Sequence, residues 1–119
     1  MSNAKRSLSV TIISCIYILT GTLGLAFHLR ESALRHEWGY GIMLISLLEI
    51  VAIIAGTYML RGANWARWLA LVWMAFHVVI SFWEGWSKVA AHAAFLLIIG
   101  YFLLRRQANE YFSPAKPLS

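Results

Sequence analysis

Residues 39–60 read GYGIMLISLLEIVAIIAGTYML, an apolar run in which Glu49 is the single charged residue. At about 1.5 Å per residue, a helix of this length crosses a hydrocarbon core of about 30 Å. Inside lipid the backbone polar groups must be satisfied within the segment or within a closed barrel, so an isolated apolar run of this kind forms a helix. The stretch predicts a transmembrane helix and decides the fold class.

Three further apolar runs surround this one, at residues 8–28, 66–83 and 89–104, the last of them barely long enough to span. The connections between the runs are short, so neighbouring helices are expected to be antiparallel. The sequence thus predicts an all-α membrane protein of one domain, residues 1–119. Its four transmembrane helices form an up-down antiparallel bundle, and residues 105–119 form a short cytoplasmic tail.

The composition agrees with a membrane protein, because 61% of the residues are hydrophobic and only 13% are charged. The first run follows Lys5 and Arg6 but is too long for the apolar region of a signal peptide, and it is read as a retained helix. The lone Cys15 excludes an intrachain disulfide. Basic residues flank helices and form no basic stripe, so we expect the lipid bilayer as partner and no nucleic acid.

The basic residues also predict the orientation. With four spans, the two termini and the middle loop share one side of the membrane. That side carries seven of the ten Lys and Arg residues, Lys5, Arg6, Arg61, Arg67, Arg105, Arg106 and Lys116, against Arg30, Arg35 and Lys88 on the other. Because cytoplasmic loops carry an excess of Lys and Arg, both termini are expected in the cytoplasm.

Small residues predict where helices approach closely. They are Ser14, Gly21 and Gly24 in the first run, Ala52 and Gly56 in the second, and Ala90 and Ala94 in the fourth. Their expected role is helix packing, within the bundle or between protomers. The outer segment 30–37 is expected to be a solvated connection in which Glu31 and Arg35 can pair at i, i+4 spacing.

Glu49 is the most informative position, because it falls at the centre of its span. An ionised carboxyl at the centre of a bilayer costs about 2.5–3.5 kcal/mol on insertion scales, so Glu49 is expected to be neutral unless a neighbour stabilises its charge. His77 and His92 lie within roughly 4–6 Å of the same height, judged from their places in the third and fourth runs. The sequence therefore predicts one layer of three ionisable side chains, able to exchange a proton.

Two more residues extend this layer outward. Glu84 is placed on the His77 face of the third helix by i, i+7 spacing, and His28 lies at the outer end of the first helix. If these faces converge, Glu84 and His28 form a polar path to the outer side. The alternative is a purely structural role. In that case Glu49 forms a hydrogen bond to Ser46 or to a neighbouring helix, each histidine has its own hydrogen-bond partner, and all of them only stabilise the bundle.

The same residues leave the cofactor open. Glu49, His77 and His92 would suit a divalent metal, since two imidazoles and a carboxylate are a common zinc or non-haem iron set. His77 and His92 alone could be axial ligands of a haem. No catalytic signature is present, so the sequence gives an enzyme no support.

The segment Asn64-Trp65-Ala66-Arg67-Trp68-Leu69-Ala70, followed by Trp73 and by Phe76-His77-Val78-Val79, resembles small bacterial four-helix membrane proteins without an assigned function. The resemblance implies a bacterial inner membrane and no mechanism. Drug exporters of similar size also use one intramembrane Glu, but in their first helix, so the likeness to them fails.

Three functions follow as hypotheses. The first is a small inner-membrane binding or transport protein whose Glu49, His77 and His92 layer takes a proton-linked small molecule or cation. Because four short helices enclose little volume, this hypothesis includes a homo-oligomer, most simply a dimer. The second is a redox membrane subunit that binds a metal or haem. The third is a non-catalytic assembly or accessory subunit.

Overall fold

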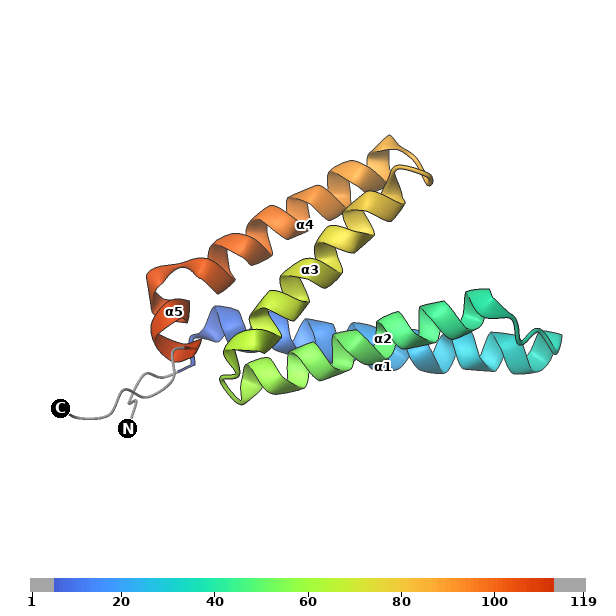
Figure 1. The fold of residues 1–119 in the computed structure, drawn as a ribbon, viewed down its shortest axis with the longest axis horizontal. Coiled ribbons are helices and arrows are strands. Elements are labelled where there is room, and N and C mark those ends of the chain that lie inside the picture. The colour runs from blue at the N-terminus through green and yellow to red at the C-terminus, as the bar shows by residue number, and fades with distance from the viewer. Residues whose placement is uncertain (1–5, 113–119) are drawn as a thin grey trace.

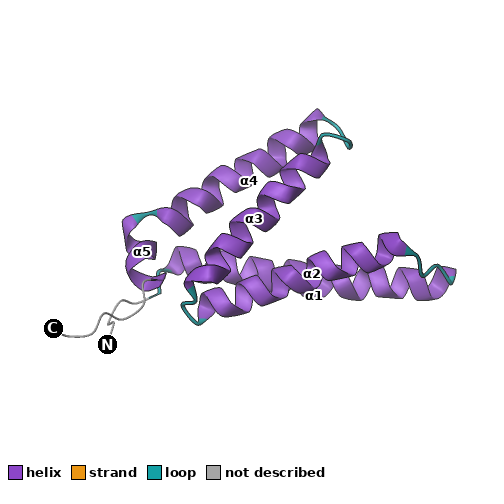
Figure 2. Cartoon of the chain, in the orientation of Figure 1, coloured by secondary structure: helices purple, strands orange, loops and turns teal. Residues whose placement is uncertain are grey.

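The computed structural model describes residues 6–112, and all of its regular structure is helical (Figure 2). Four long helices follow one another through short turns: α1 (Leu8–Arg35), α2 (Tyr40–Leu60), α3 (Asn64–Ser81) and α4 (Trp86–Leu104). A short helix, α5 (Arg106–Phe112), ends the described chain. Lys5, Lys116 and the last part of the expected tail lie outside the described residues.

Within residues 6–112, three helices are long and apolar enough to cross a membrane: α1, α2 and α4. In length and composition these three agree with the prediction of membrane-spanning helices. α3 is not among them, although it has 18 residues, because Asn64, Arg67 and His77 lower its mean hydropathy.

The helices form two hairpins. α1 packs along α2, and α3 packs along α4, while α1 and α4 touch little. Figure 1 shows that the hairpins meet near α5 and diverge toward the α1–α2 and α3–α4 turns, which gives the molecule extents of 59 × 29 × 20 Å. We call the end of the molecule near α5 the inner end and the opposite end the outer end.

Small residues make the α1–α2 contact close, as predicted. A Cβ atom on Gly21 would lie 2.6 Å from the backbone oxygen of Glu49, and one on Gly56 would lie 2.6 Å from that of Ser14. Ala52 is fully buried in the same contact region. By contrast, Ala90 and Ala94 of α4 are exposed.

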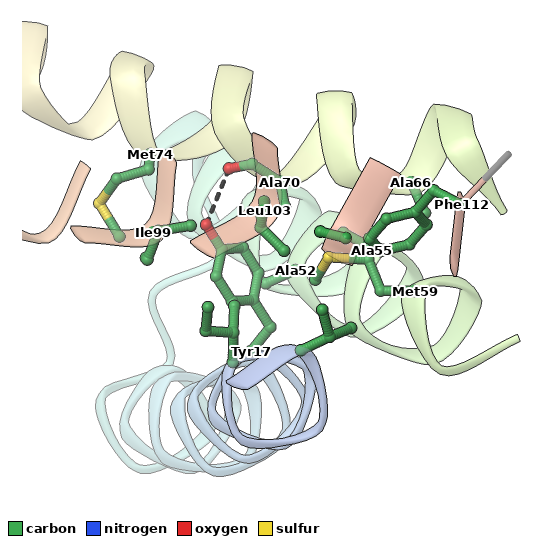
Figure 3. Packing of buried hydrophobic residues seen from close by; sticks show 13 residues of the cluster. Tyr17, Ala52, Ala55, Met59, Ala66, Ala70, Met74, Ile99, Leu103 and Phe112 are labelled. Carbon is green, nitrogen blue, oxygen red and sulfur yellow. Dashed lines mark hydrogen bonds between the residues drawn. The ribbon is translucent and has the colours of Figure 1, made fainter. Parts of the chain in front are cut away.

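Two aromatic side chains join the hairpins at mid-length. The Tyr17 hydroxyl of α1 donates a 2.8 Å hydrogen bond to the Ala70 carbonyl of α3 (Figure 3). The Trp73 indole of α3 donates a 2.7 Å hydrogen bond to the Leu48 carbonyl of α2. Each hairpin thus supplies one donor and one acceptor to these two bonds. The apolar core drawn in Figure 3 extends to both sides of the Tyr17–Ala70 bond, with Met74 and Ile99 on one side and Met59 and Phe112 on the other.

At the inner end, α5 and the start of α3 hold the other helices together. From the sequence, α5 was expected to be part of a polar tail. The Tyr111 hydroxyl lies 2.9 Å from the Met59 carbonyl and 2.7 Å from that of Leu60. Arg67 Nη1 donates to the Leu103 carbonyl at 2.9 Å. Because the last carbonyls of a helix have no partner within it, these side chains supply the missing donors for α2 and α4.

Several helix boundaries differ from those of the expected runs. α1 runs to Arg35 rather than to residue 28, and Glu31 pairs with Arg35 at 3.5 Å on its added turns. α3 lies two residues earlier than expected, from Asn64 to Ser81, and α4 begins at Trp86 rather than at residue 89. The expected first and fourth runs stopped at charged residues, whereas the helices continue through them. α1 ends where His36 takes a left-handed conformation, φ 55°.

Substituting Gly56 by Ala tests the close α1–α2 contact. The added methyl group would meet the Ser14 carbonyl, so we expect Gly56→Ala to lower the free energy of unfolding by about 1–3 kcal/mol. Gly41→Ala in the same helix is the matched control, because no atom lies within 4 Å of its Cβ position. We expect it to be neutral or stabilising by up to about 1 kcal/mol. Denaturation in mixed micelles measures both, and equal effects would contradict the contact.

Candidate functional site

A cavity of about 660 Å³ lies between the hairpins. α1 and α4 form most of its walls, α3 contributes part of one side, and α2 contributes Glu49. The lining is mainly aliphatic and aromatic, with Ile12, Ile13, Ile16, Met74, Phe95, Ile98, Ile99 and Phe102. Apolar walls with a few polar groups are typical of sites for small organic ligands.

The polar and apolar groups occupy different ends of the cavity. The lining of α1 runs from Ser9 near the inner end to His28, a rise of about 28 Å. α4 runs in the opposite direction, and Arg105 Nη2 lies 3.3 Å from Ser9 Oγ, so Phe102 lines the inner end and His92 the outer end. The cavity therefore has an ionisable outer half and an apolar inner half.

Glu49 of α2 pairs with His28 of α1. His28 Nδ1 lies 2.6 Å from Glu49 Oε1 and 2.8 Å from the Gly24 carbonyl. Gly24 makes room for this pair, because a Cβ atom there would lie 2.7 Å from Glu49 Oε1. The Glu49 side chain is 13% exposed and that of His28 37%. The charge of Glu49 thus has a partner on the adjacent helix.

The second carboxylate oxygen has no such partner. Glu49 Oε2 is buried and accepts no hydrogen bond from any described residue. Ser46 Oγ, the alternative partner that the sequence suggested, is itself buried without a hydrogen bond in the described part of the chain. Because a buried acceptor without a donor costs about 1–3 kcal/mol, Oε2 is the atom of this site with most to gain from a ligand.

His77 of α3 and His92 of α4 form a second pair. Their rings stack with centroids 6.1 Å apart and planes 24° apart. His77 Nδ1 lies 2.9 Å from the Trp73 carbonyl, and His92 Nδ1 lies 2.8 Å from the Lys88 carbonyl. A carbonyl accepts, so each Nδ1 carries the proton, and in the neutral ring each Nε2 is left as an acceptor.

Trp73 connects the two pairs. Its ring centroid lies 4.0 Å from that of His77 and 5.3 Å from that of Tyr17. Its indole nitrogen bonds to the carbonyl of Leu48, the residue before Glu49. The polar groups therefore form a row across the cavity wall, from His28 and Glu49 through Trp73 to His77 and His92.

Four of the five candidate residues line this one cavity: His28, Glu49, His77 and His92. Glu84 does not, because α3 ends at Ser81 and Glu84 lies in the following turn, 3.4 Å from Lys88 Nζ. Tyr17 and Trp73 also line the cavity, although the sequence did not mark them as site residues. Gly24 was expected only to pack helices together, and it also leaves space for the carboxyl group of Glu49.

The expected trio of metal ligands is not assembled. Among the described residues, no three His, Cys, Asp or Glu side chains come close enough to hold a metal ion. Glu49 is drawn to His28 on the neighbouring helix of its own hairpin, whereas His77 and His92 pair on the other hairpin. Counting residues along the helices placed Glu49, His77 and His92 in one layer. Because of the helix rotations, Glu49 instead pairs with His28, and the two other histidines pair with each other.

Comparison of the chain with protein-family models, curated proteins and solved structures found no match. The likeness to small bacterial membrane proteins therefore adds nothing to the site, and its function is argued from geometry alone.

A double-mutant cycle measures the pairing of His28 with Glu49. We expect His28→Ala and Glu49→Gln to be coupled by about 0.5–3 kcal/mol in the free energy of unfolding, because each removes the partner of the other. The exposed Glu31–Arg35 pair, at 3.5 Å, is the control, with an expected coupling of about 0.3–0.5 kcal/mol. Additive effects at His28 and Glu49 would show that the two side chains do not interact.

Proposed function

We propose that this chain is a small membrane protein that binds an amphipathic ligand between its two hairpins and links that binding, or transport, to proton exchange. The supporting observation is that Glu49 lines a largely apolar cavity and that its buried Oε2 atom is an acceptor without a donor among the described residues. A ligand that enters the cavity with a donor group would fill this vacancy and cover its tail against the isoleucine and phenylalanine walls.

The proton link is proposed from the environment of Glu49. Its carboxyl is held by His28, and three imidazoles line the cavity with it, those of His28, His77 and His92. A ligand that competes with His28 for Glu49 changes the balance of charge at this pair. Because neither an isolated carboxylate nor an isolated imidazolium is stable away from water, that change favours the gain or loss of a proton.

We further propose that all four long helices span a bacterial inner membrane, with both termini in the cytoplasm. α3 packs against the apolar helices α2 and α4, so it need not meet lipid on every side. Its Arg67 is 8% exposed and bonds to Leu103 and Asn109 at the inner end, away from the centre of the helix. The excess of Lys and Arg at this end supports a cytoplasmic inner end.

Reporter fusions test this topology. Alkaline phosphatase, which is active outside the cytoplasm, is expected to work when fused at Gly85 in the α3–α4 turn. Green fluorescent protein, which folds in the cytoplasm, is expected to fluoresce when fused after Ser119. A phosphatase that is inactive at Gly85 and active after Ser119 would reverse the orientation, and activity at neither or at both would contradict four spans.

The proposed site requires a single copy of the chain. A dimer was expected because four short helices enclose little volume. The cavity of about 660 Å³ is nevertheless lined by residues of one chain. Ligand binding and self-association are therefore proposed as independent properties.

Filling the cavity tests ligand binding. We expect the wild-type protein in zwitterionic lipid nanodiscs to retain at least one of dodecylamine, dodecanol and dodecanoate, detected by native mass spectrometry. Ile16→Trp, which places an indole in the cavity, is expected to reduce that retention to background. Ile45→Trp is the matched control, since Ile45 is also lipid-accessible but does not line the cavity. If the wild type retained no more of any probe than Ile16→Trp does, the proposal would be wrong.

A further inference from the structure

We infer that the ligand of this cavity is a long-chain amine, that is, an amphiphile with a cationic, hydrogen-bond-donating head and an apolar tail. This inference rests on the proposed function and specifies the chemical class of the ligand. It comes from the kind of polar atom left unused at the outer end of the cavity and from the charge of the residues around it.

Three polar atoms at the outer end are acceptors without a donor among the described residues. Glu49 Oε2 has no hydrogen bond from a described residue. The Nδ1 atoms of His77 and His92 are occupied by backbone carbonyls, so the Nε2 atoms of their neutral rings remain to accept. A primary ammonium group carries three donors and no acceptor, which matches a wall of acceptors.

The charge of the lining favours the same head. Among the cavity residues there is one carboxylate, Glu49, and neither Lys nor Arg. Of the basic side chains near its two ends, Lys88 pairs with Glu84, and Arg105 donates to Ser9 at the inner end, away from Glu49. A carboxylate or phosphate head would meet Glu49 with no permanent cation to offset the repulsion, and repulsion of this kind is how sites reject the wrong partner.

An ammonium group would also be placed next to an aromatic wall. Trp73 lines the cavity beside His77 and follows Glu49 in the row of polar groups. A cation within about 6 Å of an indole face gains about 0.5–2 kcal/mol, an attraction that neutral and anionic heads do not have.

The inner half of the cavity suits the tail. From the level of Gly24, which faces Glu49, to Ser9 the α1 wall extends about 22 Å. Over this length Ile12, Ile13, Ile16, Ile98, Ile99 and Phe102 line the cavity, with Ser9, Tyr17 and Thr20 as its polar residues and no charged one. An alkyl chain that runs from the head site toward the inner end would therefore lie against mainly apolar side chains.

Four probes that share a dodecyl tail separate the properties of the head. Dodecylamine offers charge and donors, dodecyltrimethylammonium offers charge alone, dodecanol offers one donor without charge, and dodecanoate offers a negative charge. Affinities are measured in zwitterionic nanodiscs and corrected for partition into empty nanodiscs. We expect dodecylamine to bind about tenfold or more tighter than dodecanol, as hydrogen bonds to charged groups imply, with dodecyltrimethylammonium between them and dodecanoate weakest.

Two variants assign the preference to residues. Glu49→Gln is expected to abolish the advantage of dodecylamine over dodecanol while dodecanol is still retained, which shows that the cavity remains folded. Thr20→Val, which removes a cavity hydroxyl outside the acceptor row, is the control and is expected to keep the order of the probes.

The failures of this inference and of the proposed function are distinguishable. If dodecanol or dodecanoate binds as tightly as dodecylamine, or if Glu49→Gln keeps the amine preference, the inference is overturned while the cavity remains a binding site. If no probe is retained above the Ile16→Trp level, the proposed function fails and the inference with it.

Discussion

Two hydrogen bonds across the middle of the molecule, from Tyr17 to Ala70 and from Trp73 to Leu48, determine how the hairpins sit together. Each uses a carbonyl that already belongs to a helix, so the bonds cross-link the hairpins without breaking either of them. Around these bonds and on their inner side, buried apolar residues of the helices pack into a common core. Toward the outer end the hairpins diverge, and the ionisable residues line the outer half of the cavity between them. The cross-links thus help to set how far apart the hairpins are where the ionisable residues lie.

Within that arrangement, Glu49 depends on the packing of α1 against α2. Glycines at 21 and 24 let the two helices come close enough for the carboxyl to reach His28, and any larger residue at 24 would occupy the place of Oε1. The same closeness keeps Ser46 and Oε2 away from water and from other donors. One carboxylate oxygen of Glu49, Oε1, therefore has a partner in His28, whereas the other, Oε2, has no hydrogen-bond donor among the described residues. The ligand proposals depend on this difference.

Much of this could be predicted from the sequence, because height along a membrane helix follows from counting residues. Glu49, His77 and His92 were placed in one layer on that basis, with His28 farther out, and all four line one cavity. Counting does not give the rotation of each helix, which is set by packing, so it could not divide the four residues into the pairs His28–Glu49 and His77–His92. Glu84 was misplaced because the helical face was extended beyond Ser81, where α3 ends. α5 was missed because its seven residues bury only Ala108 and Phe112, too weak a pattern to stand out from a polar tail.

The hairpins are joined at the inner end and at mid-length, but not at the outer end. Tyr111 of α5 bonds to the last carbonyls of α2, and Arg67 of α3 bonds to Leu103 of α4 and to Asn109 of α5. The described residues provide no comparable bond between the α1–α2 and α3–α4 turns. A small change in the angle between the hairpins therefore displaces the outer turns more than the joined inner end, and the width of the outer end is the dimension of the molecule that such a change alters most.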